Sequence, residues 1–182
     1  MNLFDLLILD IDGVLTNGIK TYDREHRVLS KTFMCKDFTA IKRFTAAGVK
    51  VIMISGDEWN RSMAEKRNID FYCSRDTKLS LDKSLHLSLF EKKYNIPQNK
   101  MAFVGDDYFD LQMFEKLKYT FCTSDSPNTI KNHALYVLKS KGGEGVLVEL
   151  YDIAVQKNWL VEASMSTVSD LDAKELTSAE MK

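Results

Sequence analysis

The sequence lacks a long apolar run, an excess of charge of either sign and paired cysteines. Its apolar segments are short, whereas a membrane-spanning helix needs roughly 20 predominantly apolar residues. The acidic Asp5 stands near the start of the chain, where a signal peptide carries positive charge. These features predict a cytoplasmic protein with no membrane partner.

Charge balance bears on the expected partners, and cysteine content bears on the expected state of the thiols. The chain has 26 acidic residues against 25 lysines and arginines among 182 residues, so no large field of one sign attracts nucleic acid. A small-molecule substrate is the expected partner instead. The cysteines, Cys35, Cys73 and Cys122, are odd in number and lack metal-type spacing, which predicts reduced, packing thiols.

Short apolar runs alternate along the chain with segments of helical spacing. Leu81, Leu85, Leu89, Phe90 and Tyr94 form the clearest helical stripe. Such alternation predicts an α/β fold with a mostly parallel sheet covered on both faces. Open sheets of this kind bind ligands beyond the carboxyl ends of their strands. The expected strands are 6–9, 49–54, 69–73, 101–104, 119–122 and 134–138, and the expected helices are 38–47, 58–67, 79–94, 109–117, 126–132 and 144–158.

Two segments depart from this alternation. Residues 18–22 and 27–33 flank the polar turn 23–26, which predicts a β-hairpin that serves as a flap, as a subunit contact or as a plain surface hairpin. Residues 161–182 are rich in Ser, Thr, Ala and acids without a sustained apolar face, so we expect a flexible tail. The chain is thus predicted to form one domain over 1–160, followed by that tail.

Two carboxylates, Asp10 and Asp12, follow the first apolar run at the point where a buried strand meets solvent. Crowded acids repel each other unless a cation or a shared proton compensates, and phosphoryl transfer uses such a pair. We assign attack on phosphorus to Asp10, giving an aspartyl-phosphate, and proton transfer to Asp12. Gly13 lets the backbone turn away from the strand. The structural alternative is a turn or cap with Asx hydrogen bonds.

The second expected strand also ends in a polar group. Ser55 and Gly56 follow the run 51–54, and the start of the next helix offers backbone amides to an anion. We expect these two residues to bind phosphate. The alternative is a plain turn or helix cap.

A second acidic cluster, Asp106, Asp107 and Asp110, follows the run 101–104. Carboxylate and carbonyl oxygens are the ligands that Mg²⁺ prefers. The expected ligands are Asp10, the backbone carbonyl of Asp12, and Asp106, with Asp107 or Asp110 supporting them. The alternative for Asp107 and Asp110 is an acidic helix N-terminus stabilised by the helix dipole.

A cation is also needed beside the transferring phosphoryl group. Lys78 and Lys83 both precede the 101–104 strand, and their spacing does not choose between them. Most lysines on a helix are solvated surface groups, which is the alternative for each.

Taken together, these motifs resemble the haloacid dehalogenase superfamily of phosphotransferases. The resemblance rests on residues 10–16, Ser55, a Lys and the segment 105–107, and it covers about residues 3–158. Further similarity narrows it to the capless branch, which includes 3-deoxy-octulosonate 8-phosphate phosphatases, nonulosonate 9-phosphate phosphatases and the C-terminal domain of some acylneuraminate cytidylyltransferases. That similarity lies in Thr16-Asn17-Gly18 with the hairpin, Lys36-Asp37, Asp110 and Lys141-Gly142-Gly143-Glu144-Gly145.

The resemblance implies a Rossmann-like three-layer sandwich with bound magnesium and a hairpin flap after the first strand. It implies no cap domain, because residues 19–57 leave no room for one. It further implies a homotetramer in which a neighbour's hairpin or tail closes the site. Lys83, 22 positions before Gly105, matches the catalytic lysine of the family, with Lys78 as the fallback.

Departures from the family pattern bear on the substrate. At the position after the Ser-Gly or Thr-Gly step, octulosonate phosphatases carry Arg and the nonulosonate group carries Glu. This chain has Asp57-Glu58 there, which favours a nonulosonate-type substrate. Arg61 and Lys66 are expected contacts to a sugar-acid carboxylate, with plain surface charge as the alternative. Glu144 stands where relatives often have Arg, which removes one potential anion contact.

The resulting hypothesis is a magnesium-dependent phosphomonoester hydrolase that acts on the terminal phosphate of a 3-deoxy-2-keto sugar acid, either nonulosonate 9-phosphate or octulosonate 8-phosphate. One alternative is a phosphatase for another small sugar phosphate. A receiver-like signalling domain is less well supported, because its phospho-acceptor lies further along the chain. A non-catalytic assembly domain of a cytidylyltransferase-type system is the last alternative, and the presence of every candidate catalytic group argues against it.

Overall fold

The short apolar runs become the strands of a six-stranded parallel sheet. The computed structural model describes residues 2–75 and 82–180, and for 176–180 it describes the backbone alone. Every neighbouring pair in the order β5-β4-β1-β6-β7-β8 is parallel, which confirms the predicted sheet. The strands are β1 (Leu6–Leu9), β4 (Lys50–Ser55), β5 (Asp70–Cys73), β6 (Met101–Gly105), β7 (Tyr119–Cys122) and β8 (Tyr136–Val137).

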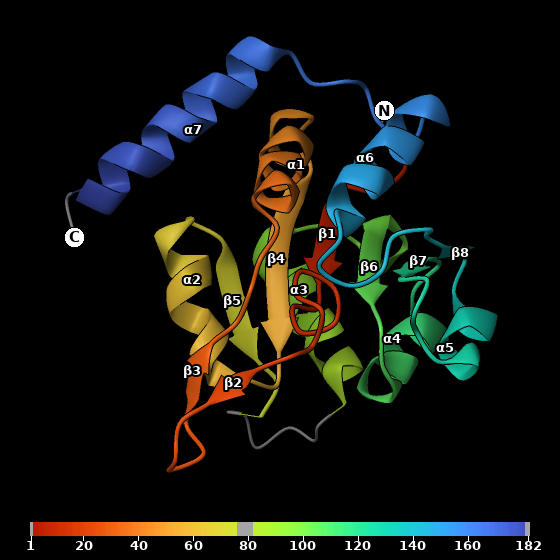
Figure 1. Cartoon of the computed structure of the whole chain (residues 1–182). Helices are drawn as coiled ribbons and strands as arrows, with labels where there is room; N and C mark the ends of the chain where they lie inside the picture. Colours follow the sequence, from red (N-terminus) through yellow and green to blue (C-terminus); the bar gives the residue numbers. More distant parts are fainter. Residues whose placement is uncertain (1, 76–81, 181–182) are drawn as a thin grey trace.

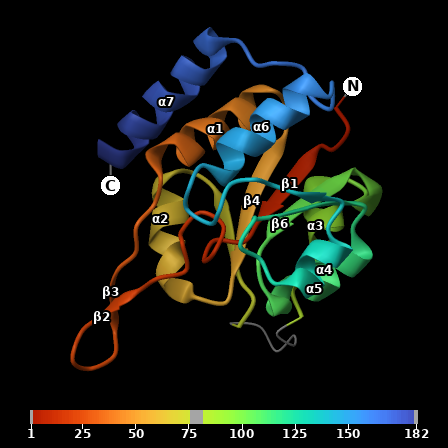
Figure 2. The same ribbon diagram turned by 45° about the vertical axis from the view of Figure 1, so that its right-hand side comes forward.

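Helices cover both faces of this sheet because alternate strand residues point to opposite sides. Leu7 and Leu9 belong to one buried cluster, whereas Leu6 and Ile8 belong to another. Figures 1 and 2 show the two helical layers with the sheet between them, so the predicted three-layer sandwich is confirmed. The first cluster contains residues of α1 (Cys35–Ala46), α2 (Arg61–Lys66) and α6 (Val146–Gln156), and the second contains residues of α3 (Leu87–Tyr94), α4 (Leu111–Lys116) and α5 (Asn128–His133).

The strand order reverses at β1, and this reversal places the site. Leu9 is in register with Met53 of β4 and with Val104 of β6, so the carboxyl ends of these three strands meet at one edge of the sheet (Figure 1). Ligands of open α/β sheets bind at such a switch point. Short 3₁₀ turns lie in the connections: η1 (Glu58–Asn60), η2 (Lys83–His86), η3 (Gln98–Lys100) and η4 (Tyr108–Asp110).

The predicted hairpin is present as a separate antiparallel pair, β2 (Thr21–Tyr22) with β3 (Val28–Ser30). It is shorter than the sequence pattern predicts. Figure 1 places it at the edge where β1, β4 and β6 end. Residues 10–49 contain this hairpin and α1 as their regular elements, in agreement with the predicted absence of a cap domain.

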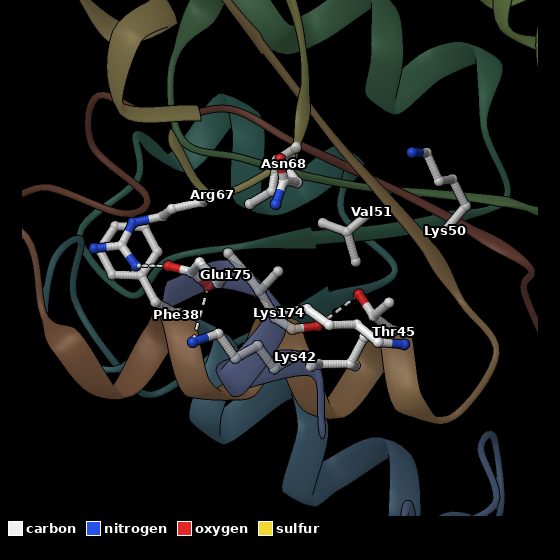
Figure 3. A pocket seen from close by; sticks show the side chains of 12 residues that line it. Phe38, Lys42, Thr45, Lys50, Val51, Arg67, Asn68, Lys174 and Glu175 are labelled. Carbon is white, nitrogen blue, oxygen red and sulfur yellow. Dashed lines mark hydrogen bonds and ion pairs between the residues drawn. The ribbon is translucent and has the colours of Figure 1, made fainter. Parts of the chain in front are cut away.

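The C-terminal segment, expected as a flexible tail, contains the helix α7 (Met165–Glu180). Val168 of α7 is buried, and Glu175 pairs with Lys42 at 2.9 Å and with Arg67 at 2.9 Å. A pocket of about 280 Å³ lies between α7, α1 and the start of β4 and β5, as Figure 3 shows. Mobility of the segment stays a prediction, but residues 165–180 are helical, and the buried Val168 and the ion pairs of Glu175 connect this helix to the rest of the domain.

The predicted helical stripe is wrong in part. Leu87 and Phe90 are buried, whereas Leu85 and Leu89 are about half exposed. The helix starts with the tighter turn η2 before α3, and a 3₁₀ turn has fewer residues than an α-helical one, so the buried face shifts. Leu81 lies outside the described residues.

The cysteines are free thiols, as predicted, and Cys73 and Cys122 are buried. Cys35 is exposed at the start of α1 and therefore does not pack as expected. Among the residues that the structure describes, no helix has both the length and the apolar character needed to cross a bilayer.

Candidate active site

Asp10 lies at the carboxyl end of β1 and is almost fully buried. Its backbone N–H donates to Val104 O (2.9 Å), and its Oδ1 accepts from the N–H of Ile11 (2.8 Å). Its Oδ2 lies 3.0 Å from Lys83 Nζ. Burial raises the pKa of Asp10 to about 7 although Lys83 opposes the rise. A carboxylate held in this way lines the cleft with its position fixed.

Lys83 is the cation beside Asp10, in agreement with the choice made from the resemblance. Its ammonium is buried and lies 2.6 Å from Asp110 Oδ1. Burial alone would lower the pKa of Lys83, but Asp10 and Asp110 raise it above its ordinary value, so the group stays charged. Asp82 starts its turn by accepting from the N–H of Ser84 at 2.8 Å. Lys78 lies outside the described residues.

Three carboxylates, those of Asp10, Asp106 and Asp110, gather within 4.8 Å of one another, counting one oxygen of each. Asp110 has both oxygens engaged, because Oδ1 accepts from Lys83 and Oδ2 accepts from the N–H of Asp106 at 2.9 Å and of Asp107 at 3.3 Å. The geometry therefore favours a supporting position for Asp110. Asp107 caps η4 by accepting from the N–H of Tyr108.

Asp106 differs from Asp110 in having a free oxygen. Its buried Oδ1 has no hydrogen-bond partner among the described residues. Burial, followed by the charges of Asp10 and Asp110, raises the pKa of Asp106 to about 9. Such a set of hard oxygen donors with an unsatisfied member fits a divalent cation such as Mg²⁺, held by Asp10 and Asp106.

Gly13 makes room for this cluster. Its φ is +88°, and a Cβ at this position would lie 1.9 Å from Asp106 Oδ2, so a side chain is excluded both by conformation and by volume. The turn after β8 closes over the same loop, since the N–H of Gly143 donates to Val14 O at 2.9 Å. A Cβ on Gly142 would lie 2.2 Å from Gly13 O. The loop after β1 is therefore fixed from two sides.

Asp12 points toward the hairpin. Its Oδ1 lies 2.8 Å from Lys31 Nζ, and its Oδ2 accepts from Asn60 Nδ2 at 3.2 Å. The Lys31 side chain is fully buried, while the Asp12 side chain is 21% exposed. Lys20 lies 3.4 Å from Asp12 Oδ2. Two hairpin lysines thus reach the proposed acid and base.

The end of β4 adds two more polar residues, Ser55 and Asp57, to the lining of the cleft. Ser55 is buried, and its Oγ accepts from the N–H of Asp57 and from Asn60 Nδ2, both at 3.1 Å. Asp57 accepts from Lys20 at 2.7 Å and from Lys31 at 2.9 Å. Burial would raise the pKa of Asp57, but the hydrogen bonds from Lys20 and Lys31 outweigh it and hold the pKa at about 2.

Most of the predicted site residues line one open cleft of about 490 Å³. Four do not. Asp110 is fully buried behind the cleft, where it accepts from Lys83 and from the N–H of Asp106. Glu58 pairs with Arg61 on the exposed side of η1, Arg61 lies over the Phe71 ring, and Lys66 is exposed at the end of α2. The predicted residues that line the cleft are Asp10, Asp12, Ser55, Gly56, Asp57, Lys83, Asp106 and Asp107.

Sequence reasoning missed several of the described residues at this site, including four with charged or amide side chains. Lys20 and Lys31 come from the hairpin, Asn60 from η1, and Arg75 from the loop after β5. Lys20 directly precedes β2 and Lys31 directly follows β3, and a lysine beside so short a strand carries no periodic signal. The one available clue was the prediction of a hairpin next to an acidic loop, which would have made its lysines candidates for pairing.

Comparison with known proteins agrees with this geometry. A family model described as haloacid dehalogenase-like hydrolase matches residues 76–150. The 3-deoxy-D-manno-octulosonate 8-phosphate phosphatase of Haemophilus influenzae is 29% identical over 150 residues, which cover 82% of each chain.

Solved structures show the same fold. The cobalt-bound form of the Haemophilus influenzae phosphatase superposes with a TM-score of 0.76 at 28% identity, over 85% of this chain and 88% of that one. The Moraxella catarrhalis phosphatase in complex with magnesium ion, phosphate ion and KDO has a TM-score of 0.76 at 21% identity, over 87% and 90%. At the latter identity the likeness concerns the fold alone.

Proposed function

We propose that this phosphatase, which belongs to the haloacid dehalogenase-like hydrolases, removes the terminal phosphate from a 3-deoxy-2-keto sugar acid with the help of Mg²⁺. The observation that carries the proposal is the placement of Asp10 against Lys83 at 3.0 Å, with Asp106 in the same carboxylate cluster and Asp12 lining the same cleft. A nucleophile, a fixed cation, a metal site and a proton carrier are thereby proposed to act together at one edge of the sheet.

In the first half of the reaction an Asp10 oxygen attacks phosphorus. The bond to the ester oxygen breaks, and Asp12 gives a proton to the departing alkoxide. Lys83, held by Asp10 and Asp110, keeps a positive charge beside the transferring group. Ser55, whose hydroxyl lies among the N–H of Asp57 and the amide of Asn60, is placed to bind a phosphate oxygen.

In the second half a water attacks the aspartyl-phosphate and gives its proton to Asp12. Inorganic phosphate leaves, and the Asp10 carboxylate is restored, so one ester and one water give one alcohol and one phosphate. Magnesium bound by Asp10, the Asp12 carbonyl and Asp106 would neutralise the negative charge that the phosphate shares with these acids. The cobalt-bound form of the Haemophilus influenzae relative supports a divalent ion.

The substrate class rests on the relatives and on the cleft. The chain matches the Haemophilus influenzae octulosonate 8-phosphate phosphatase over 82% of both lengths. The open cleft of about 490 Å³ has room for a sugar acid beside its phosphate. Asp57 also lines this cleft, and an acid at this position favours a nonulosonate-type substrate. Its carboxylate already accepts hydrogen bonds from Lys20 and Lys31 of the hairpin region.

The test is phosphate release with Mg²⁺ from 3-deoxy-octulosonate 8-phosphate, nonulosonate 9-phosphate and hexose 6-phosphates. We expect one of the two sugar acids to be turned over best, and the Asp10→Asn variant to lose turnover and the acid-trapped phosphoenzyme together. Undiminished turnover by Asp10→Asn would exclude the mechanism. If no substrate releases phosphate, the proposed substrate class is wrong and the alternative of a non-catalytic assembly domain gains support.

We further propose a homotetramer in which the hairpin contacts a neighbouring subunit. Three large apolar side chains of the hairpin region, Ile19, Tyr22 and Leu29, are 70%, 50% and 59% exposed, and such side chains mark contact surfaces when they gather. Sedimentation equilibrium gives the mass of the assembly. Activity should fall on dilution to the monomer, and a fully active monomer would contradict the proposal.

A further inference from the structure

Among the residues that the structure describes, four cationic side chains line or border the cleft, and three of them are already neutralised. Lys83 pairs with Asp10 and Asp110, and Lys20 and Lys31 pair with Asp12 and Asp57. The fourth is Arg75, two positions after β5, which lines the same cleft. Within residues 2–75 and 82–175, no carboxylate forms an ion pair with its guanidinium.

Arg75 has a defined place, because it lies across Gly56. A Cβ built on Gly56 would be 2.8 Å from Arg75 Nε and 3.3 Å from its Cζ. Gly56 does not have the positive φ that demands glycine. The position therefore requires glycine because a side chain would occupy the space that Arg75 fills. The guanidinium therefore covers the backbone between Ser55 and Asp57 at the end of β4. The Ser55 hydroxyl, which we propose binds phosphate, lies at the same strand end.

We propose that Arg75 binds the carboxylate of the sugar acid and so sets the specificity of the cleft for substrates with a second negative charge. This rests on the proposed function. A guanidinium matches a carboxylate with two parallel hydrogen bonds. Because its own charge is unpaired among the described residues, Arg75 can bind an anion without first releasing a protein carboxylate, whereas Lys20, Lys31 and Lys83 cannot.

The spacing suits such a substrate. Arg75 follows β5 and Asp10 follows β1, and one strand, β4, lies between them. Neighbouring strands are about 4.8 Å apart, so the two strand ends lie about 10 Å apart across the sheet. A chain of eight or nine carbons with bonds of about 1.5 Å can reach from a phosphate at Asp10 to a carboxylate at Arg75, since the two groups stand at opposite ends of the molecule.

The test compares steady-state kinetics of Arg75→Gln and Arg75→Lys with two kinds of substrate. The first is whichever of octulosonate 8-phosphate and nonulosonate 9-phosphate the unaltered protein prefers, and the second is glucose 6-phosphate, which has no carboxylate. A charge-assisted contact contributes about 1.5–3 kcal/mol, so Arg75→Gln should raise KM for the acid by about 10- to 100-fold with kcat nearly retained. KM for glucose 6-phosphate should not change, and Arg75→Lys should retain part of the effect.

Two controls separate binding from a structural role. Lys92→Gln removes a cation from the exposed face of α3 and should leave both substrates unaffected. Added guanidinium ion at low millimolar concentration should partly restore the acid KM of an Arg75→Ala variant, which a lost structural contact would not permit.

The outcomes distinguish the two proposals. If the unaltered protein prefers glucose 6-phosphate to both acids, the proposed substrate is wrong. The proposed role of Arg75 is then wrong as well, because it depends on that substrate. If the unaltered protein prefers an acid and Arg75→Gln keeps that preference, or loses kcat equally on both substrates, the role of Arg75 alone is overturned.

Discussion

Lys31 Nζ lies 2.8 Å from Asp12 Oδ1, so the residue that directly follows β3 joins the hairpin to the proposed proton carrier. The same ammonium is 2.9 Å from Asp57 and 2.8 Å from Asn60 Oδ1, and its side chain is fully buried. The position of the hairpin and the orientation of Asp12 are therefore coupled, because one cation holds both.

Replacing this cation tests the coupling. In Lys31→Met the carboxylates of Asp12 and Asp57 lose a shared partner, and a lost charged hydrogen bond costs about 1.5–3 kcal/mol. We expect kcat to fall by about 10- to 100-fold and proteolysis within the hairpin to become faster. Arg27→Gln, which removes an exposed ion pair at the hairpin tip, is the matched control and should change neither. An unchanged kcat in Lys31→Met would show that Asp12 is oriented without the hairpin.

The Lys83→Met variant should lose stability in a pH-dependent way. It leaves the buried Asp10 and Asp110 without their cation, and breaking a buried pair costs about 3–5 kcal/mol. Burial raises the pKa of Asp10 to about 7, and loss of Lys83, which opposes this rise, raises it further. Asp10 then binds more protons in the folded protein than in the unfolded chain, so stability falls as pH rises. Urea unfolding in EDTA should show a larger loss at pH 8 than at pH 5. A loss independent of pH would mean that the acids are not the cause.

Cation binding should release protons. Burial raises the pKa of Asp10 to about 7 and that of Asp106 to about 9, and a metal binds the deprotonated forms. Mg²⁺ affinity should therefore increase from pH 6 to pH 9, with about two protons released at pH 6 and about one at pH 8. Titration calorimetry in two buffers of different ionisation enthalpy counts them. Asp106→Asn should lower both the affinity and the proton count, and a pH-independent affinity would argue against this site.

Asp37 joins α1 to the start of α6. Its buried Oδ1 accepts from the N–H of Leu147 at 2.9 Å and of Val148 at 3.3 Å. Asp37→Ala leaves one buried and one partly buried N–H donor without its partner, so unfolding free energy should fall by about 1–3 kcal/mol. Urea denaturation measures it, with the exposed Asp152→Ala as control, expected within about 0.5 kcal/mol of the unaltered protein. KM and kcat should persist, because Asp37 does not line the cleft.

The fold was predictable because its signals are local. Buried parallel strands read as short apolar runs, and runs such as Leu6–Leu9 have no competing interpretation when amphipathic segments separate them. The α7 segment was missed for the opposite reason. Its docking depends on Glu175 meeting Lys42 and Arg67, which are more than a hundred positions away in the chain, and no pattern within the segment records them.

The site divides in the same way. Asp10, Asp12 and Asp106 were predictable because acids directly after apolar runs are conspicuous. Spacing alone left Lys83 and Lys78 equal, and resemblance favoured Lys83, which the structure places against Asp10. Lys31 and Arg75 reach the cleft through a hairpin and a loop, where side-chain direction depends on the fold rather than on neighbouring residues.

Because β1 lies in the middle of the sheet, between β4 and β6, the residues that surround Asp10 are synthesised after it. Asp10 emerges from the ribosome first, but Lys83 follows β5, and Asp106 follows β6, the strand that pairs with the second edge of β1. The turn at Gly142 and Gly143, which closes over the loop after β1, comes later still. A nascent chain therefore carries the proposed nucleophile before the residues that are proposed to act with it, and the turn that fixes its loop is made in the last third of the chain.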